Sequence, residues 1–325
     1  MNKAIAIIAG EPNSISSEVI FKAWRSLKKN KTKKLIVIGS IKLLELQKKK
    51  LKQKIKIREI QNNFNLKKFK KNEMQVLNVE FVQKKPFQKI SCKSNKYIFK
   101  CFDLAINLIK LKKISGLVNC PIAKEKLFEK NYQGITEFIS KKFKSKGKEV
   151  MLLYNKKLSV SPLTTHIPIN KISKNITKKK IINNIKTINN FYKKNLKKKP
   201  KFAILGLNPH NFSGYKYSEE DRIIKPSIKA LKKININVIG PVSPDSIFLY
   251  YKKYNVDVIL GMYHDQVLSP FKTLYKYDAI NVTLGLPCAR VSPDHGVAEN
   301  IMGKNIADPK SLIISINFLL KLNNF

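Results

Sequence analysis

The sequence predicts an α/β protein of two lobes, each with a largely parallel sheet covered by helices. Two observations support this fold class. Short apolar runs of strand length recur along the 325 residues, and segments with the periodicity of an amphipathic helix separate several of them. The apolar share of 43% is enough to fill real cores, and the chain is long for one compact domain but comfortable for two lobes around a cleft.

The predicted strands are the short apolar runs. They are Ala4–Ala9, Leu35–Ile38, Gly116–Asn119, Val150–Tyr154, Phe202–Leu207, Val256–Leu260 and Ile280–Leu284. Helical spacing occurs between several of them: Ile98, Phe102 and Ala105 fall on one face, and the run 311–320 predicts a terminal helix packed on a lobe. Strands that alternate with helices favour a parallel sheet, in which ligands bind at the carboxyl ends of the strands.

The amino terminus and the cysteines predict a cytoplasmic protein without a membrane span. No apolar run approaches the ~20 residues that a membrane-spanning helix needs. The stretch Ala4–Ala9 is shorter than the ~7–15 residue core of a secretion signal, so we interpret it as a buried first strand. No C-x-x-C pair suggests a disulfide framework or a thiolate zinc site. The four scattered cysteines are Cys92, Cys101, Cys120 and Cys288.

The formal charge of +44 raises the question of nucleic-acid binding. Of the 65 basic residues only four are arginine, the type that base and phosphate contacts favour: Arg25, Arg58, Arg222 and Arg290. In the segment 178–194, Ile181, Ile185 and Ile188 recur at helical spacing while lysines fill other positions, which is typical of a solvated helix face. We therefore expect no specific nucleic-acid partner, although non-specific attraction to phosphate follows from the charge.

Four histidines form the first group of candidate site residues. All lie in polar or turn-rich segments of the second half: His166, His210, His264 and His295. A single loop histidine is usually only a hydrogen-bonding residue, but three on loops at corresponding strand ends favour a shared metal site, because imidazole is the commonest ligand of borderline divalent metals. Their spacing matches no local signature such as H-E-x-x-H, so both interpretations stay open from the residues alone.

Two further groups lie downstream. Lys272, Asn281 and Arg290 are candidate anion partners, and a retained arginine in so lysine-rich a chain indicates bidentate phosphate or carboxylate binding or, equally, a surface ion pair. The loop from Asp294 to Asn305 contains His295 and Gly296. No G-x-G-x-x-G follows a strand, so this loop either holds a nucleotide in another way or is an ordinary turn.

Taken together, these segments resemble the 4-hydroxythreonine-4-phosphate dehydrogenase family of pyridoxal phosphate biosynthesis. The matching stretches, in the family's order, are Gly10-Glu11-Pro12, Thr164-Thr165-His166-Ile167-Pro168, Gly206-Leu207-Asn208-Pro209-His210, Gly240-Pro241 with Asp245, Met262-Tyr263-His264-Asp265-Gln266, and Gly285-Leu286-Pro287 through Asp294-His295-Gly296. They span nearly the whole chain. The Tyr-His-Asp-Gln and Asn-Pro-His segments are the most specific.

The resemblance implies the fold of isocitrate and isopropylmalate dehydrogenases, with two α/β/α lobes and a cleft between them. Residues 1–128 with 303–325 would form the first lobe. Residues 129–302 would form the second lobe, which carries the metal ligands and the interface of a homodimer with its active site shared between the chains. No membrane and no specific nucleic acid is implied as a partner.

The resemblance also implies roles for individual residues. The ligands of a divalent metal (Zn, Mg or Co) are His166, His210 and His264, the last expected from the partner chain. The residues that bind the small phosphorylated substrate are Thr136, Lys272, Asn281 and Arg290. The residues that bind NAD or NADP are His295, Gly296 and Asn305. Asp245 and Asp265 are candidates for the catalytic base, and either could instead orient a histidine.

The implied reaction is NAD(P)-dependent oxidation of the C3 hydroxyl of 4-phosphohydroxy-L-threonine. The resulting 3-keto acid decarboxylates to 3-amino-2-oxopropyl phosphate in pyridoxal 5'-phosphate biosynthesis. The chain departs from the family at Ile135, where a histidine usually contacts the substrate, and in the glycine-poor segment 13–17. Two alternatives follow: a dehydrogenase of a phosphorylated four-carbon sugar acid (threonate or erythronate 4-phosphate), or a catalytically lapsed, lysine-rich nucleic-acid-binding protein.

Overall fold

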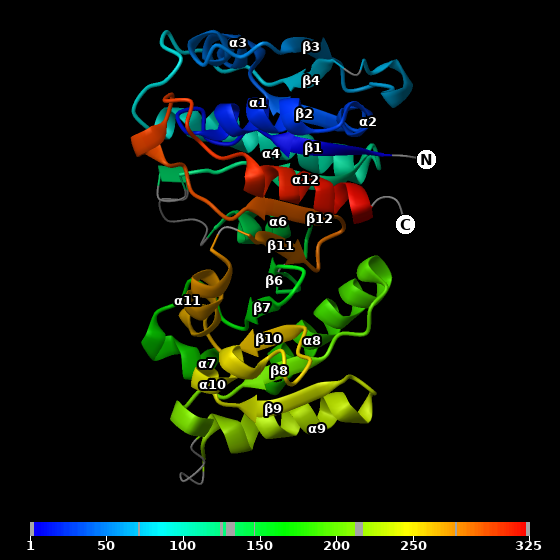
Figure 1. Ribbon diagram of the computed structural model, residues 1–325, viewed down its shortest axis with the longest axis vertical. Coiled ribbons are helices and arrows are strands. Elements are labelled where there is room, and N and C mark those ends of the chain that lie inside the picture. The colour runs from blue at the N-terminus through cyan, green and yellow to red at the C-terminus, as the bar shows by residue number, and fades with distance from the viewer. Residues whose placement is uncertain are drawn as a thin grey trace. The chain divides into compact units, whose positions relative to one another are not determined.

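The computed structural model describes residues 3–70, 72–123, 126–127, 134–145, 147–211, 217–276 and 278–322. The chain divides into two compact units. Unit 1 is Met1–Gly147 with Leu286–Phe325, and unit 2 is Lys148–Gly285. Each unit contains a sheet with helices packed on it, so the predicted α/β fold class is confirmed (Figure 1).

The sheet of unit 1 is parallel, in the order β3-β4-β2-β1-β5-β12. Its strands are β1 (Ala4–Ile8), β2 (Leu35–Gly39), β3 (Lys56–Ile60), β4 (Glu73–Asn78), β5 (Ile114–Asn119) and β12 (Ala289–Pro293). The central strands β1 and β2 are buried along their whole length, which explains their unbroken apolar sequence. The carboxyl ends of β1, β5 and β12 therefore lie at the same edge of this sheet.

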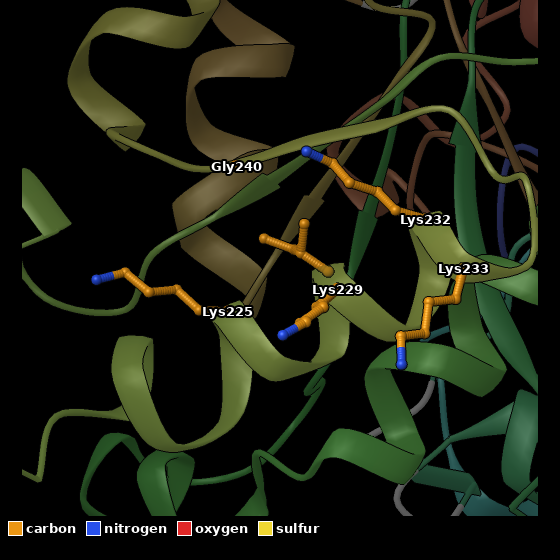
Figure 2. A pocket seen from close by; sticks show the side chains of 6 residues that line it. Lys225, Lys229, Lys232, Lys233 and Gly240 are labelled. Carbon is orange, nitrogen blue, oxygen red and sulfur yellow. The ribbon is translucent and has the colours of Figure 1, made fainter.

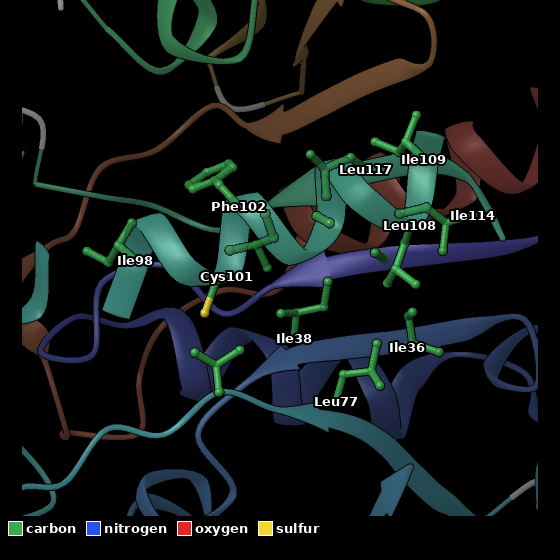
Figure 3. Close-up of a cluster of buried hydrophobic side chains, with 14 of the residues drawn as sticks. Ile36, Ile38, Leu77, Ile98, Cys101, Phe102, Leu108, Ile109, Ile114 and Leu117 are labelled. Carbon is green, nitrogen blue, oxygen red and sulfur yellow. The ribbon is translucent and has the colours of Figure 1, made fainter. Parts of the chain in front are cut away.

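Helices cover the sheet of unit 1 through apolar stripes. They are α1 (Ser16–Ser26), α2 (Lys29–Thr32), α3 (Ile41–Lys50), α4 (Asn95–Lys110), α6 (Ile135–Lys142) and α12 (Lys310–Leu322), with short 3₁₀ turns at Leu66–Lys68, Cys92–Ser94 and Glu299–Ile301. In α4 the predicted apolar face is buried: Ile98 and Phe102 are at most 1% exposed and join one core with Ile36 and Ile38 of β2 (Figure 3). Tight packing of this kind makes α4 a fixed support for the sheet.

The sheet of unit 2 is mixed, in the order β11-β6-β7-β10-β8-β9. Its strands are β6 (Val150–Tyr154), β7 (Ser159–Pro162), β8 (Phe202–Leu205), β9 (Val238–Val242), β10 (Val258–Gly261) and β11 (Ile280–Leu284). Strand β6 is antiparallel to both of its neighbours, while β7, β10, β8 and β9 are mutually parallel. The four parallel strands therefore all end at one edge of this sheet.

The helices of unit 2 pack on this sheet. They are α7 (Ile172–Asn175), α8 (Lys178–Phe191), α9 (Lys225–Lys233), α10 (Pro244–Tyr250) and α11 (His264–Tyr275), with 3₁₀ turns at Ile169–Lys171 and Pro209–Asn211 and π-helical turns at Tyr192–Leu196 and Glu220–Ile224. Ile181, Ile185 and Ile188 of α8 are fully buried, as their spacing predicts. Within the described ranges, no helix is long and apolar enough to cross a membrane.

The unit boundaries differ from the predicted lobe boundaries in two segments. Residues 129–147 and 286–302 are predicted in the second lobe, but their described parts belong to unit 1. The reason is packing: Phe138 of α6 stacks at 5.1 Å from Phe99 of α4, and β12 pairs with β5 through Ala289 and Gly116. Both contacts join segments that are far apart in sequence. The polar stretch before Gly134 predicts a domain boundary, but side-chain contacts in the core of unit 1 join residues on the two sides of it.

Candidate active site

Candidate site residues of unit 2 follow the parallel strands at the edge where these strands end. His166 follows β7, His210 follows β8, Asp245 follows β9, and His264 is the first residue of α11 after β10. Because parallel strands deliver their carboxyl ends to the same edge, segments far apart in the sequence meet there. The sheet topology thus gathers four of the predicted residues.

His166 and His264 are neighbours within the chain. Their ring centroids lie 5.9 Å apart, and the planes are tilted by 40°. The His264 Nδ1 atom lies 2.9 Å from Asp265 Oδ1, so this carboxylate holds one ring nitrogen and leaves the other to face away from it. The His264 side chain is 35% exposed and that of Asp265 78%. The side chains of His264 and Asp265 are therefore accessible to a small molecule.

His210 lies with a different carboxylate. Its Nδ1 atom is 3.6 Å from Asp245 Oδ2, and its side chain is 82% exposed. The hydroxyl of Ser243 donates to Asp245 and, with the nearby His210, lowers the pKa of that carboxyl below its usual value. Asp245 is therefore ionised at neutral pH, in the form that a proton acceptor requires.

The donor types fit a borderline divalent cation, since three neutral imidazoles are common ligands for such ions. Two rings as close as those of His166 and His264 can share an ion whose bonds to nitrogen are about 2.0–2.1 Å long. Yet the described residues of one chain contain no group of three or more His, Cys, Asp or Glu side chains that could hold a metal ion. The predicted three-histidine group is not formed within this part of a single chain.

Lys272 shares helix α11 with His264, and Asn281 lies on strand β11 of the same unit. Lys272 is exposed on α11, about two turns after His264. Asn281 is half-buried on β11, and its Oδ1 atom is buried without a hydrogen-bond partner among the described residues. A buried polar atom of this kind is uncommon and marks a place where a bound group can supply the missing bond.

Arg290 forms the centre of the candidate anion site in unit 1. It is 3% exposed on β12, its Nε donates to Asn119 Oδ1 at 2.7 Å, and its Nη1 donates to Thr136 Oγ1 at 3.3 Å. Burial lowers the pKa of Arg290 to about 10, so the guanidinium stays charged at neutral pH. A residue this deeply buried is not a surface ion pair. Its orientation is set by Asn119, for which the sequence predicts no role.

Ile135 lies beside this group in sequence but belongs to the core. It begins α6, is 3% exposed, and is part of the apolar cluster that contains Phe138 and Ile139. It therefore contributes packing and offers no polar atom. Of the adjacent pair, only Thr136 reaches the Arg290 guanidinium.

The predicted cofactor residues also lie in unit 1. His295 Nδ1 is 3.2 Å from the Gly296 carbonyl, its Nε2 is buried without a hydrogen-bond partner within the described ranges, and burial lowers its pKa. Gly296 is exposed. The Asn305 carbonyl accepts from Lys22 Nζ at 2.9 Å and its side-chain oxygen from Gln53 at 3.2 Å, so the end of this loop is tied to α1. The loop is thus anchored, with one unpaired imidazole nitrogen.

Several residues that shape these groups have no role predicted from the sequence. Glu11 is 2% exposed, accepts from the Asn13 amide and the Ser94 hydroxyl, and has its pKa raised by burial. Glu220 and Gln266 are buried beside the histidine loops of unit 2. Gln266 lies in the Tyr-His-Asp-Gln segment and could have been found there, whereas Glu220 carries no signal in the sequence.

A separate hollow of about 510 Å³ lies between side chains of α9 and Gly240 of β9. It is lined by Lys225, Ile228, Lys229, Lys232, Lys233 and Gly240, with the lysines on one face of the helix (Figure 2). None of the predicted site residues lines it. Helical spacing on a solvated face explains the lysine arrangement without a ligand.

Comparison with known proteins gives full-length matches. Residues 31–319 match the family model of the pyridoxal phosphate biosynthetic protein PdxA. A 4-hydroxythreonine-4-phosphate dehydrogenase of Sulfurihydrogenibium sp. (strain YO3AOP1) is 38% identical over 98% of both chains. A D-threonate 4-phosphate dehydrogenase of Salmonella typhimurium is 31% identical, over 98% of this chain and 99% of the relative.

Solved structures agree with these matches. A crystal structure of 4-hydroxythreonine-4-phosphate dehydrogenase from Klebsiella pneumoniae superposes with a TM-score of 0.84 at 26% identity, and covers 99% of both chains. An isocitrate dehydrogenase from Methylococcus capsulatus superposes with a TM-score of 0.52 at 11% identity, over 98% of this chain and 85% of its own. The second likeness concerns the fold alone, and it confirms the predicted relation to the isocitrate dehydrogenase fold.

Proposed function

Because the chain belongs to the PdxA family of dehydrogenases, we propose that it oxidises the C3 hydroxyl of 4-phosphohydroxy-L-threonine with NAD or NADP. Hydride passes to the nicotinamide and the hydroxyl proton to a base. The 3-keto acid then loses carbon dioxide to give 3-amino-2-oxopropyl phosphate. The observation that carries the proposal is the gathering of His166, His264 and the His210–Asp245 pair where the parallel strands of unit 2 end.

Arg290 binds the negative charge of the substrate in this proposal. Its charge is buried and its Nε is held by Asn119, so the guanidinium can meet a phosphate or carboxylate in a fixed orientation. Thr136 has a hydroxyl beside the guanidinium, and Lys272 offers an ammonium group to the same kind of anion. The unpaired Asn281 Oδ1 is an acceptor, so in this proposal it takes a hydrogen bond from a donor of the substrate, the ammonium group or a hydroxyl. Fixed charges of this kind lower the barrier by holding the reacting carbon in place.

The metal ligands in this proposal are His166, His210 and His264. A divalent ion held by these rings would supply positive charge beside the reacting oxygen of the substrate. Because the described residues of one chain do not bring all three rings together, the proposal places the complete group in a homodimer. The family resemblance assigns His166 and His210 to one chain and His264 to the partner subunit, whereas the closeness of His166 and His264 within one chain would leave His210 as the ligand that crosses the interface. Asp245 accepts the hydroxyl proton, with its depressed pKa keeping it ionised, and Asp265 orients the His264 ring.

Cofactor binding falls to the segment from His295 to Asn305. The buried, unpaired Nε2 of His295 is available to a hydrogen-bonding group of NAD or NADP. Its lowered pKa keeps the ring neutral at neutral pH, so Nε2 either donates or accepts according to the tautomer. Exposed Gly296 leaves room for close approach of the cofactor.

A second candidate substrate is D-threonate 4-phosphate, which carries a hydroxyl where the amino acid has its ammonium group. It is favoured by the 31% identity to a D-threonate 4-phosphate dehydrogenase and by the loss of a polar side chain at Ile135. Both substrates present the same phosphate and the same C3 hydroxyl, so the residues above serve either.

The test is production of reduced cofactor from each substrate by the purified full chain, with and without a chelator. We expect turnover of 4-phosphohydroxy-L-threonine that the chelator abolishes, and a lower kcat/KM on D-threonate 4-phosphate. Arg290→Lys should lower kcat/KM by a factor that corresponds to about 1.5–3 kcal/mol of transition-state stabilisation, because the paired N–H donors of the guanidinium are lost. The matched change Arg222→Lys, at an exposed arginine, should have no effect. A chain that reduces neither NAD nor NADP with either substrate contradicts the proposal.

A further inference from the structure

The three histidine loops of unit 2 are joined by buried side chains that no step of the proposed reaction uses. We infer that Gln266 and Glu220 are positioning residues. Together they hold the His210 loop, residues 206–211, in place relative to the start of α11. The inference concerns the same site as the proposed function and rests on it.

Gln266 connects two of the loops through both ends of its amide. Its Nε2 donates to the Gly206 carbonyl at 2.8 Å, and its Oε1 accepts from the Met262 amide at 2.7 Å. Gly206 begins the segment that leads to His210, and Met262 lies two residues before His264. Gln266 is 8% exposed, so water does not readily replace these bonds.

The His166 loop is attached to the same point. Both the amide nitrogen and the hydroxyl of Thr164 donate to the Met262 carbonyl, at 3.2 and 2.7 Å. The N–H of Met262 therefore donates to Gln266, and the carbonyl of Met262 accepts hydrogen bonds from Thr164. One backbone residue links the segments that carry all three histidines.

Glu220 holds the start of the His210 loop, at the two residues that follow Gly206. Its carboxylate is fully buried and accepts from the amides of Leu207 and Asn208 at 2.7 and 2.9 Å, and from the Asn208 side chain at 2.8 Å. Its charge is thus met by three donors of the loop, which is how a buried carboxylate becomes tolerable. The side chain therefore acts as a template for residues 207–208.

The loop needs such anchors because its backbone is strained. His210 and Asn211 both have left-handed backbone angles, with φ of 52° and 55°. Asparagine and histidine adopt this conformation more readily than most residues, but a side chain still makes it less favourable than the right-handed one, so contacts of the loop help to keep it. Loss of the Gln266 or Glu220 bonds should let the loop relax and carry the His210 ring away from its place.

Gln266→Glu tests this with almost no change in shape. The substitution keeps an acceptor for the Met262 amide but sets a carboxylate oxygen against the Gly206 carbonyl. We expect faster hydrogen exchange in the peptide that covers residues 203–211, and a Co²⁺ dissociation constant raised about 10- to 100-fold, the usual effect of removing a group that orients a ligand. The coordination spectrum of bound Co²⁺ should change as well.

Gln47→Glu is the matched control. Gln47 is also buried and donates to two backbone carbonyls, of Pro12 and Pro86, but it lies in unit 1. It should lower the melting temperature similarly and leave Co²⁺ affinity and spectrum as in the unmodified chain. If Gln266→Glu does not fold, Glu220→Gln provides the test, because it keeps the acceptor for the loop amides and removes only the one that faces Asn208.

The outcomes separate the inference from the proposed function. An unmodified chain that binds no Co²⁺ refutes the proposed metal site, and the exchange measurement still tests the loop. Unchanged exchange at 203–211 in both Gln266→Glu and Glu220→Gln overturns the inference. Co²⁺ binding weakened equally by Gln266→Glu and Gln47→Glu also overturns it, because a general loss of stability would then explain the result.

Discussion

Arg290 shows how much structure is needed to keep one buried charge. Removing a guanidinium from water is costly unless hydrogen bonds and opposite charge replace the lost solvent. Asn119 and Thr136 supply hydrogen bonds, and the Glu137 carboxylate raises the pKa against the effect of burial. The four arginines of the chain are therefore not equivalent: at this one, separate nitrogens of a planar guanidinium bond Asn119 and Thr136, a fixed geometry that the single nitrogen of a lysine does not reproduce.

His295 gives a pH-dependent contribution to stability. Burial lowers its pKa below the ordinary value of 6.5. Between the two values the unfolded chain takes up a proton that the folded chain does not, so the free energy of unfolding falls as the pH drops below about 6.5. His295→Gln should remove this part of the acid destabilisation. Denaturant titrations of both proteins from pH 7.5 to about 5 measure it, and parallel stability curves would contradict the assignment.

Single residues of the candidate site were predictable where residue type alone was informative. Histidine and arginine are rare in this chain, so His166, His264 and Arg290 are conspicuous in the sequence itself. Asn119 and Glu220 are not, because their roles here come from bonds to residues distant in sequence: Glu220 bonds Leu207, 13 residues away, and Asn119 bonds Arg290, 171 residues away. Roles that arise only from long-range contacts leave no local pattern.

At the scale of elements, strands with an unbroken apolar run were predictable, and strands with charged, polar, glycine or proline residues were not. The apolar runs at β1, β2, β5, β6, β8, β10 and β11 match the strands closely. Five of the described strands were missed. Strand β3 has exposed or half-buried charged residues, and β4 and β12 carry polar residues between their apolar ones. Strand β7 has buried serines at 159 and 161, and Gly240 and Pro241 interrupt β9. The missed strands β7 and β9 lead to the candidate residues His166 and Asp245. The strand order of the structure, and not the sequence, therefore shows that the loops with the candidate residues lie at one edge of the sheet.

The turn after β1 depends on a glycine. Gly10 has a φ of +76°, and a Cβ there would lie 2.4 Å from the Pro121 carbonyl oxygen, whereas Gly147 has a φ of +80° with nothing within 4 Å in the described structure. Gly147→Ala should therefore cost only the left-handed backbone, about 1–2 kcal/mol. Gly10→Ala should cost about 3 kcal/mol or more, because backbone must also move. Urea unfolding of the pair measures the difference, and equal losses would show that the Pro121 contact is not limiting.

At the scale of the whole molecule, the charge of +44 dominates the surface but not the site. Basic side chains of this number attract any polyanion. Such binding weakens steeply as the salt concentration rises, because the release of the polyanion's counterions then gains less free energy. The α9 lysines around the hollow are a dense local example (Figure 2). Their regular spacing on a helix face gives them no geometry that selects one anion.

We therefore expect single-stranded DNA to bind this chain weakly and without sequence preference. The double change Lys229→Glu with Lys232→Glu, at the hollow, should weaken binding no more than Lys178→Glu with Lys179→Glu at the exposed start of α8. The two pairs change the net charge equally, so fluorescence anisotropy at several salt concentrations compares placement alone. A much larger loss for the hollow pair would instead identify a specific anion site there.

The assembly of two chains determines whether the histidines act together. His166 and His264 are neighbours in one chain, and no third ligand joins them among its described residues. Suppose that the partner subunit's His264 completes each site. The variants His166→Ala and His264→Ala are then inactive alone, but a mixed dimer of the two has one intact site. Random mixing should restore about a quarter of full turnover. Inactive mixtures of these two, with activity restored instead when His166→Ala is mixed with His210→Ala, would show that His166 and His264 bind from the same chain and that His210 crosses the interface. Turnover after co-refolding decides between the two arrangements, because each leaves a different pair of variants able to complement.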